Sequence, residues 1–135
     1  MAIGLPEREN TELIFWGIIG AVTGGATAFP VPGSGTWAEG ATELQLPIPS
    51  AGRVMNLYVY ARTASGGVVT DTITIRRNGA NTAITCTLVG AAVSGNDITN
   101  RQGYLVGDRI SVSYVAGAGS VAANIIIVVE IKLTE

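Results

Sequence analysis

The sequence contains no histidine, a single lysine (Lys132) and a single cysteine (Cys86). Without histidine, Ser-His-Asp and Cys-His catalysis and most zinc sites are excluded. One cysteine cannot form an intrachain disulfide. Because Cys86 alternates with the inward residues of an expected strand, we expect it to be a small core hydrophobe. Lys132 follows Glu130 closely on the last expected strand, so we interpret it as part of a solvated ion pair and not as a catalytic base.

Paired carboxylates are the remaining common device for acid-base catalysis. Glu39 with Glu43 is one candidate pair, and Asp71, Asp97 and Asp108 are expected in separate turns, where aspartate bonds to the local backbone. For all of these acids, we expect a structural role and not a catalytic one. We therefore predict that the protein is not an enzyme.

Two further stretches contain residue types that occur in ligand sites. Asn96, Asp97 and Asn100 could offer oxygen atoms to calcium, but a polar loop with one charge is a weak calcium site. The glycine-rich stretch 32–40 lacks both the GxGxxG spacing of a dinucleotide loop and the lysine of a P-loop. The sequence therefore predicts no metal and no cofactor.

Charge is also scarce. Only 13% of the residues are charged, the net charge is −2, and the mean hydropathy is +0.41. Eight cations spread among ten acids give no basic patch, which argues against nucleic acid as a partner. We interpret Arg76-Arg77, the one basic pair, as a solvated hairpin end. A chain this apolar is expected to bury part of its surface against other copies or another protein.

Long hydrophobic runs are absent too. The longest, 13–22, has about half the length that a membrane-spanning helix requires. The first residues carry no early run of positive charge, so no signal peptide is expected. We expect no membrane partner, and assembly in the cytoplasm.

What is present is period-two alternation between glycine-rich turns, which indicates an all-β antiparallel sandwich or barrel. Residues 72–88 predict a hairpin that turns at Asn78-Gly79. The prolines and glycines of 23–52 predict loops with short edge strands, one of them near 42–48. Strands are further expected at 13–22, 53–62, 109–115 and 121–133, and a polar loop at 90–100. We predict an arm at 1–12 and one domain at 13–135.

The first and last strands are apolar on both faces. In 121–133, the face from Ile125 to Leu133 is apolar, and Ile126 and Val128 also make the opposite face apolar. An exposed Val or Ile forfeits roughly 1.5–3 kcal/mol of burial, so both faces should be covered. We expect both strands in one sheet whose outer face is buried against other subunits. The alternative is that the chain's own loops, within 23–52, cover them.

Most of the chain, from about residue 29 to 133, resembles a domain of tailed-phage structural proteins with a C1q/TNF-like jelly-roll fold. The motifs that carry the resemblance are "PIPSAGRVMNLYVYA", "TITIRRNGANTAITCTL", "SGNDITN" and "VGDRISVSYV". Members of this kind resemble trimers that decorate capsids as cement proteins or form the heads of tail fibres. The resemblance implies an antiparallel jelly-roll β-sandwich that is trimeric, with the sheet of the terminal strands along the three-fold axis.

This resemblance, together with the two-faced strands, predicts a homotrimeric decoration protein on the virion surface that binds the major capsid protein. The expected trimer interface is Leu13, Phe15, Ile18, Ile19, Ile126 and Val128. The expected capsid contact is Pro6, Glu7, Arg8 and Glu9. The alternative is a receptor- or glycan-binding head from a tail fibre or base plate, whose ligand face would contain Trp37, Tyr58 and Tyr60.

Overall fold

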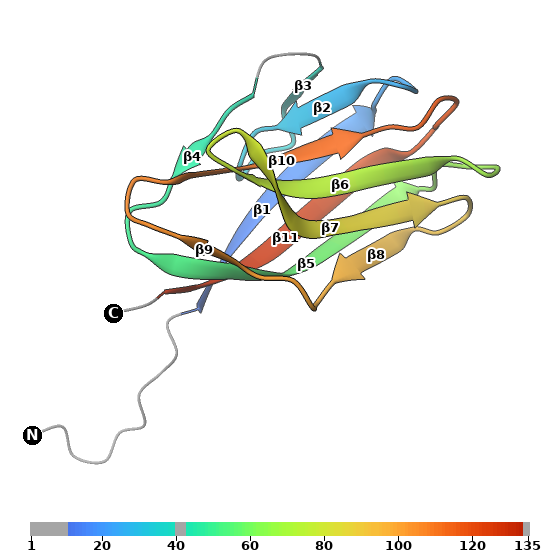
Figure 1. Cartoon of the computed structure of the whole chain (residues 1–135). Coiled ribbons are helices and arrows are strands. Elements are labelled where there is room, and N and C mark those ends of the chain that lie inside the picture. The colour runs from blue at the N-terminus through green and yellow to red at the C-terminus, as the bar shows by residue number, and fades with distance from the viewer. Residues whose placement is uncertain (1–10, 40–42, 134–135) are drawn as a thin grey trace, which may run out of the picture.

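The computed structural model describes residues 11–39 and 43–133 and shows a sandwich of two antiparallel sheets (Figure 1). One sheet has the order β1-β11-β5-β8, with β9 also paired to β5; the other has the order β3-β2-β10-β6-β7, with β4 also paired to β10. The strands are β1 (Thr11–Ala21), β2 (Thr27–Pro30), β3 (Trp37–Glu39), β4 (Leu46–Pro47), β5 (Gly52–Thr63), β6 (Thr70–Arg77), β7 (Ala80–Val89), β8 (Ser94–Asp97), β9 (Gln102–Tyr104), β10 (Arg109–Val115) and β11 (Ala123–Leu133). The all-β prediction is confirmed. In this part of the chain, no helix is long and apolar enough to cross a membrane.

The hairpin prediction is confirmed. β6 pairs with β7 around Asn78 and Gly79, whose φ angles of 50° and 81° are those of a tight two-residue turn. Ile73 and Ile75 on one strand, and Ile84 and Leu88 on the other, are fully buried. The alternation in this stretch therefore identifies the core-facing residues correctly. Cys86 lies buried among them, as predicted.

The two terminal strands lie side by side in the five-stranded sheet, as expected. β1 pairs with β11 from Thr11↔Lys132 to Ala21↔Ala123. The strand therefore begins two residues before the predicted domain start, because Thr11 and Glu12 already belong to the ladder. The rest of the predicted arm, including Pro6, Glu7, Arg8 and Glu9, lies outside the described residues.

Two details of the sequence prediction are wrong. The expected strand near 42–48 is reduced to β4, and the predicted loop 90–100 contains β8. In β5, a bulge between Met55 and Tyr58 interrupts the alternation, so that Val54 and Leu57 both face the core. Asn56 makes the bulge possible, because it adopts φ 53° and its side chain donates to Glu130 Oε2 at 3.3 Å.

Asp71 is not in a turn but inside β6, and it is completely buried. Its carboxyl oxygens accept hydrogen bonds from the Tyr114 hydroxyl, from Ser120 Oγ at 2.8 Å and from the backbone N–H of Gly117 at 2.9 Å. Burial, and then Asp71 itself, raise the pKa of the Tyr114 hydroxyl. The carboxyl group thus holds the β10–β11 connection against the core.

Replacing Asp71 with alanine is expected to lower the free energy of unfolding by about 3 kcal/mol, because it leaves buried donors without an acceptor. Urea unfolding followed by tryptophan fluorescence measures this change. Thr87→Ala, on an exposed position of β7, is the control and should change stability by less than about 0.5 kcal/mol. An equally small change for Asp71→Ala would contradict the assigned role.

Candidate interaction surface

The outward side of the five-stranded sheet carries a band of large apolar and aromatic side chains. Cross-strand pairing places Phe15 beside Val128 and Val128 beside Tyr58, and in the next row Ile126 lies between Gly17 and Tyr60. These two rows contain no charged residue. We call this surface the open face; its members are Leu13, Phe15, Ile19, Tyr58, Tyr60, Ile126 and Val128.

The large side chains of the open face are exposed to a degree unusual for such residues in a folded domain. The exposed fraction is 66% for Leu13, 74% for Ile19 and 45% for Phe15, and Tyr58 and Tyr60 are each more than half exposed. Isolated apolar residues on a surface are ordinary, but a contiguous patch marks a contact site. The open face is therefore the strongest candidate for a functional surface.

Ile18 does not belong to this surface. It was predicted at the trimer interface, but it points to the opposite side of β1 and is only 1% exposed, among core residues that include Trp16 and Ile127. The reason is the strict alternation of the strand, which places neighbouring residues on opposite faces. Leu13, Phe15, Ile19, Ile126 and Val128 do lie together on the outward side, as predicted.

The predicted ligand face is divided. Tyr58 and Tyr60 share the open face with the predicted interface residues, whereas Trp37 lies on β3 in the other sheet. Trp37 is half-buried, and its indole N–H donates to the carbonyl of Ile19 at 3.1 Å. Sequence reasoning missed that the tyrosines and the terminal strands form one surface, because β5 and β11 become neighbours only through long-range pairing.

Where it is described, the long loop region reaches only the β1 edge of the open face, where Ser34 and Gly35 lie against Gly17 and Ile19; its part around Glu43 covers the other sheet. Glu43 bonds to Arg76 at 2.6 Å and to Ser111 at 2.7 Å, across the outward side of β6 and β10. Burial by itself raises the pKa of Glu43, but bonds from Gln45, Ser111 and Arg76 outweigh it and hold the pKa below its usual value. Among the described residues, the chain's own loops therefore cover the apolar strands at this edge alone, and Leu13, Phe15 and Tyr58 stay exposed.

The outer edge of β1 is closed by the segment 33–35. Gly33 N–H donates to the Phe15 carbonyl at 2.7 Å, Gly17 N–H to Ser34 at 2.8 Å and Ile19 N–H to Gly35 at 3.2 Å. At the β8 side of the sheet, a Cβ on Gly95 would lie 2.8 Å from the Thr87 carbonyl oxygen, so β8 packs closely against β7. Two edges of the sheet are thus occupied, and its outward face is the part left for a partner.

The predicted solvated pair Arg76-Arg77 is not solvated. Arg76 pairs with Glu43, and Arg77 pairs with Asp108 at 2.7 Å. Both arginines are half-buried, because the loops that supply these acids come from distant parts of the chain. The hairpin end is therefore held in place by ion pairs.

The candidate acids all have structural partners. Asp97 accepts bonds from the backbone of Thr85, Thr99 and Asn100 and from the Asn100 side chain. Burial by itself raises the pKa of Asp97, but these bonds outweigh it and lower the pKa to about 2. Glu39 accepts from the Thr23 N–H at 3.0 Å and shares no partner with Glu43. Across residues 11–39 and 43–133, no cluster of three acids or cysteines could hold a metal.

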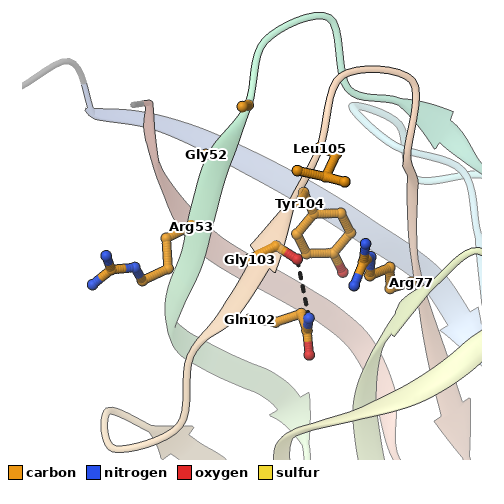
Figure 2. A pocket seen from close by; sticks show the side chains of 8 residues that line it. Gly52, Arg53, Arg77, Gln102, Gly103, Tyr104 and Leu105 are labelled. Carbon is orange, nitrogen blue, oxygen red and sulfur yellow. Dashed lines mark hydrogen bonds between the residues drawn. The ribbon is translucent and has the colours of Figure 1, made fainter. Parts of the chain in front are cut away.

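A hollow of about 450 Å³ is lined by residues at the start of β5, along β9 and at the end of β6 (Figure 2). Figure 2 shows the Arg77 guanidinium beside the Tyr104 ring, whereas Arg53 points away from the hollow. The Tyr104 hydroxyl donates to the Arg76 carbonyl at 2.9 Å, and the Gln102 amide donates to the Gly103 carbonyl at 3.0 Å. The residues that line the hollow include two arginines, a tyrosine and a glutamine but no carboxylate.

No protein-family model matches the chain, and no curated protein matches its sequence.

Proposed function

We propose that this protein is a virion structural protein: a homotrimeric jelly roll that decorates and stabilises the head of a tailed phage. The observation that carries the proposal is the open face, an apolar band with two uncharged central rows on the sheet that holds both terminal strands. In the proposed trimer this face surrounds the three-fold axis. The phage resemblance of the sequence motifs supports the choice of virion over other assemblies.

We expect self-association through the exposed face of the five-stranded sheet and not through its β1 edge. Strand addition along residues 15–19 of β1 is blocked because the outer N–H and C=O groups there already bond to the segment 33–35. Burial of Leu13, Phe15 and Ile126 recovers hydrophobic free energy that the isolated chain forfeits. Copies arranged around a three-fold axis form a closed assembly, and most soluble oligomers have closed symmetry.

Decoration would stabilise the shell by bridging. Each trimer would contact several capsid subunits, so disruption of the shell requires many contacts to break together. Residues 6–9 remain the proposed capsid contact, and the described chain begins at Thr11, at one end of the sandwich. The proposed location is the outer surface of the capsid, after assembly in the host cytoplasm.

The test is the copy number of this chain relative to the major capsid protein in purified virions, measured by quantitative mass spectrometry. We expect near-stoichiometric abundance. A handful of copies per particle would move the protein to the tail and favour the second function below. Absence from particles would overturn the proposal.

The second function is a receptor- or glycan-binding head, favoured by two tyrosines on one strand face. Tyr58 and Tyr60 are each about half exposed and lie two residues apart on β5, a spacing that can stack on sugar rings. In this second function the tyrosines bind a ligand and not other subunits, so a Tyr58→Ala/Tyr60→Ala variant should lose ligand and keep the wild-type oligomeric state. Removal of residues 1–10, which leaves β1 intact, should abolish capsid binding in a decoration protein and leave ligand binding in a receptor protein unchanged.

A further inference from the structure

An apolar groove of about 320 Å³ opens between the two sheets at the end of the sandwich where β1 begins and β11 ends. One wall is made by Ile14 of β1 and by Ile131 and Leu133 of β11, and the other by residues 46–50, which include β4. Figure 1 shows these strand ends together at one end of the molecule. The groove is therefore an opening into the space between the sheets, lined mostly by aliphatic side chains and proline rings.

The groove is continuous with the hydrophobic core. Ile48 and Ile131, each 3% exposed, belong to the core, and Ile14, Leu46 and Leu133 pack against it while only partly buried. An apolar cavity of roughly 150 Å³ can hold a benzene-sized group, so the larger groove has room for two aliphatic side chains. Side chains that entered it would extend the core.

The two edge strands that line the groove are open on their second sides. In the described part of the chain, β4 is paired with β10 alone, and β1 is the edge strand of its sheet. The bonds from the segment 33–35 lie at residues 15–19 of β1, beyond the groove. An extended segment lying here would thus meet apolar side chains and two strand edges that lack a second strand.

The sequence before Thr11 has the chemistry of such a segment. Among the residues outside the described ranges, large apolar side chains occur only in this stretch. They include Ile3 and Leu5, which alternate with the small residues Ala2 and Gly4. In an extended conformation, the large side chains therefore share one side. The charged residues of the stretch all come later, so its first five residues carry no charged side chain.

We propose that residues 1–5 of this chain lie in the groove of their own domain, with the side chains of Ile3 and Leu5 between the two sheets. The chain enters the sandwich at Thr11, next to Glu12, which lines the groove. Leu5 is six residues from Thr11, so the link between them can span up to about 20 Å, enough for the chain to reverse its direction once. A segment tethered so close has a local concentration of about millimolar, which favours its own groove over that of another copy.

The docking would fix residues 6–9 at both ends. These residues would then form a link between the groove and β1, with their charged side chains in water. The inference does not depend on the decoration function, because the groove and the sequence of residues 1–5 carry it alone.

The test compares the thermal unfolding of the wild-type chain, an Ile3→Asp/Leu5→Asp variant and the control Ala2→Asp/Gly4→Asp. Both variants add two carboxylates to the same stretch, but only the first places them on the side of the large apolar residues. We expect the first variant to unfold at least about 5 °C below the wild type, because two aliphatic side chains leave the core. The control should stay within about 2 °C of the wild type. Equal midpoints for the two variants would overturn the proposal.

A second experiment traps the contact directly. A Leu5→Cys/Ser50→Cys variant places one thiol on the segment and one at the groove, while the native Cys86 is buried. After mild oxidation, peptide mapping by mass spectrometry should find the disulfide within one chain. The control Leu5→Cys/Thr87→Cys, whose second thiol lies on an exposed position of β7, should stay reduced.

The other outcomes contradict the proposal in distinct ways. A disulfide between two chains would overturn docking in the segment's own groove and assign the segment to a neighbouring copy. Absence of any disulfide in the Leu5→Cys/Ser50→Cys variant would overturn the contact itself. Neither measurement involves a virion, so a failure here would leave the decoration function standing.

Discussion

Replacing Ile126 with aspartate is expected to convert the proposed trimer to a folded monomer. Ile126 lies at the centre of the open face, between Gly17 and Tyr60, and is 38% exposed. In a separate subunit the new carboxylate reaches water, so the sandwich stays intact. At an interface of identical copies, it would bring like charges together in an apolar contact, which is strongly unfavourable.

Sedimentation equilibrium would show the mass fall from three times 13.9 kDa to that of a single chain, and circular dichroism would show an unchanged β-sheet spectrum. The matched control is Thr87→Asp, an exposed position on β7 in the other sheet. This variant should remain trimeric. A trimeric Ile126→Asp protein would rule out the open face as the interface.

The adjacent positions Ile18 and Ile19 should respond to aspartate in opposite ways. Ile18→Asp places an unpaired carboxylate in the core, and we expect it to reduce the free energy of unfolding by at least about 4 kcal/mol. For a domain of ordinary stability, that loss leaves a large unfolded population. Ile19, at 74% exposure on the open face, should tolerate aspartate as a folded monomer.

Urea unfolding and circular dichroism distinguish the two results. Ile18→Val is the control for Ile18, and its expected loss is about 1 kcal/mol, because it removes a single buried methylene group. If Ile18→Asp folded normally and only dissociated, the assignment of Ile18 to the core would be wrong.

The sequence was informative wherever local alternation and turn residues decide the structure. The turn at Asn78-Gly79 and the inward positions of β6, β7 and β11 follow from period two alone. The placement of both terminal strands in one sheet followed from a burial argument, since a strand that is apolar on both sides needs cover on both. These are properties that a short stretch of chain carries by itself.

What could not be predicted depends on residues far apart in the chain. Glu43 meets Arg76 and Ser111 through the fold, and no local pattern indicates that partnership. Asp71 looks like a turn residue because aspartate favours turns, yet its donors come from β10 and the loop after it. Ile18 and Ile19 are chemically identical, so only the register of β1 on β11 shows which one faces the core.

The closure of the middle of the β1 edge by the segment 33–35 also bears on how the free protein behaves. A charge-poor chain made in many copies is at risk of growing into fibrils through exposed strand edges. With Phe15, Gly17 and Ile19 already bonded along that edge, new copies cannot add there strand by strand. In the proposed trimer, association through the open face stops once every open face is buried against the other subunits. In the proposed function, the unassembled protein would therefore stay as small, finite particles available for assembly.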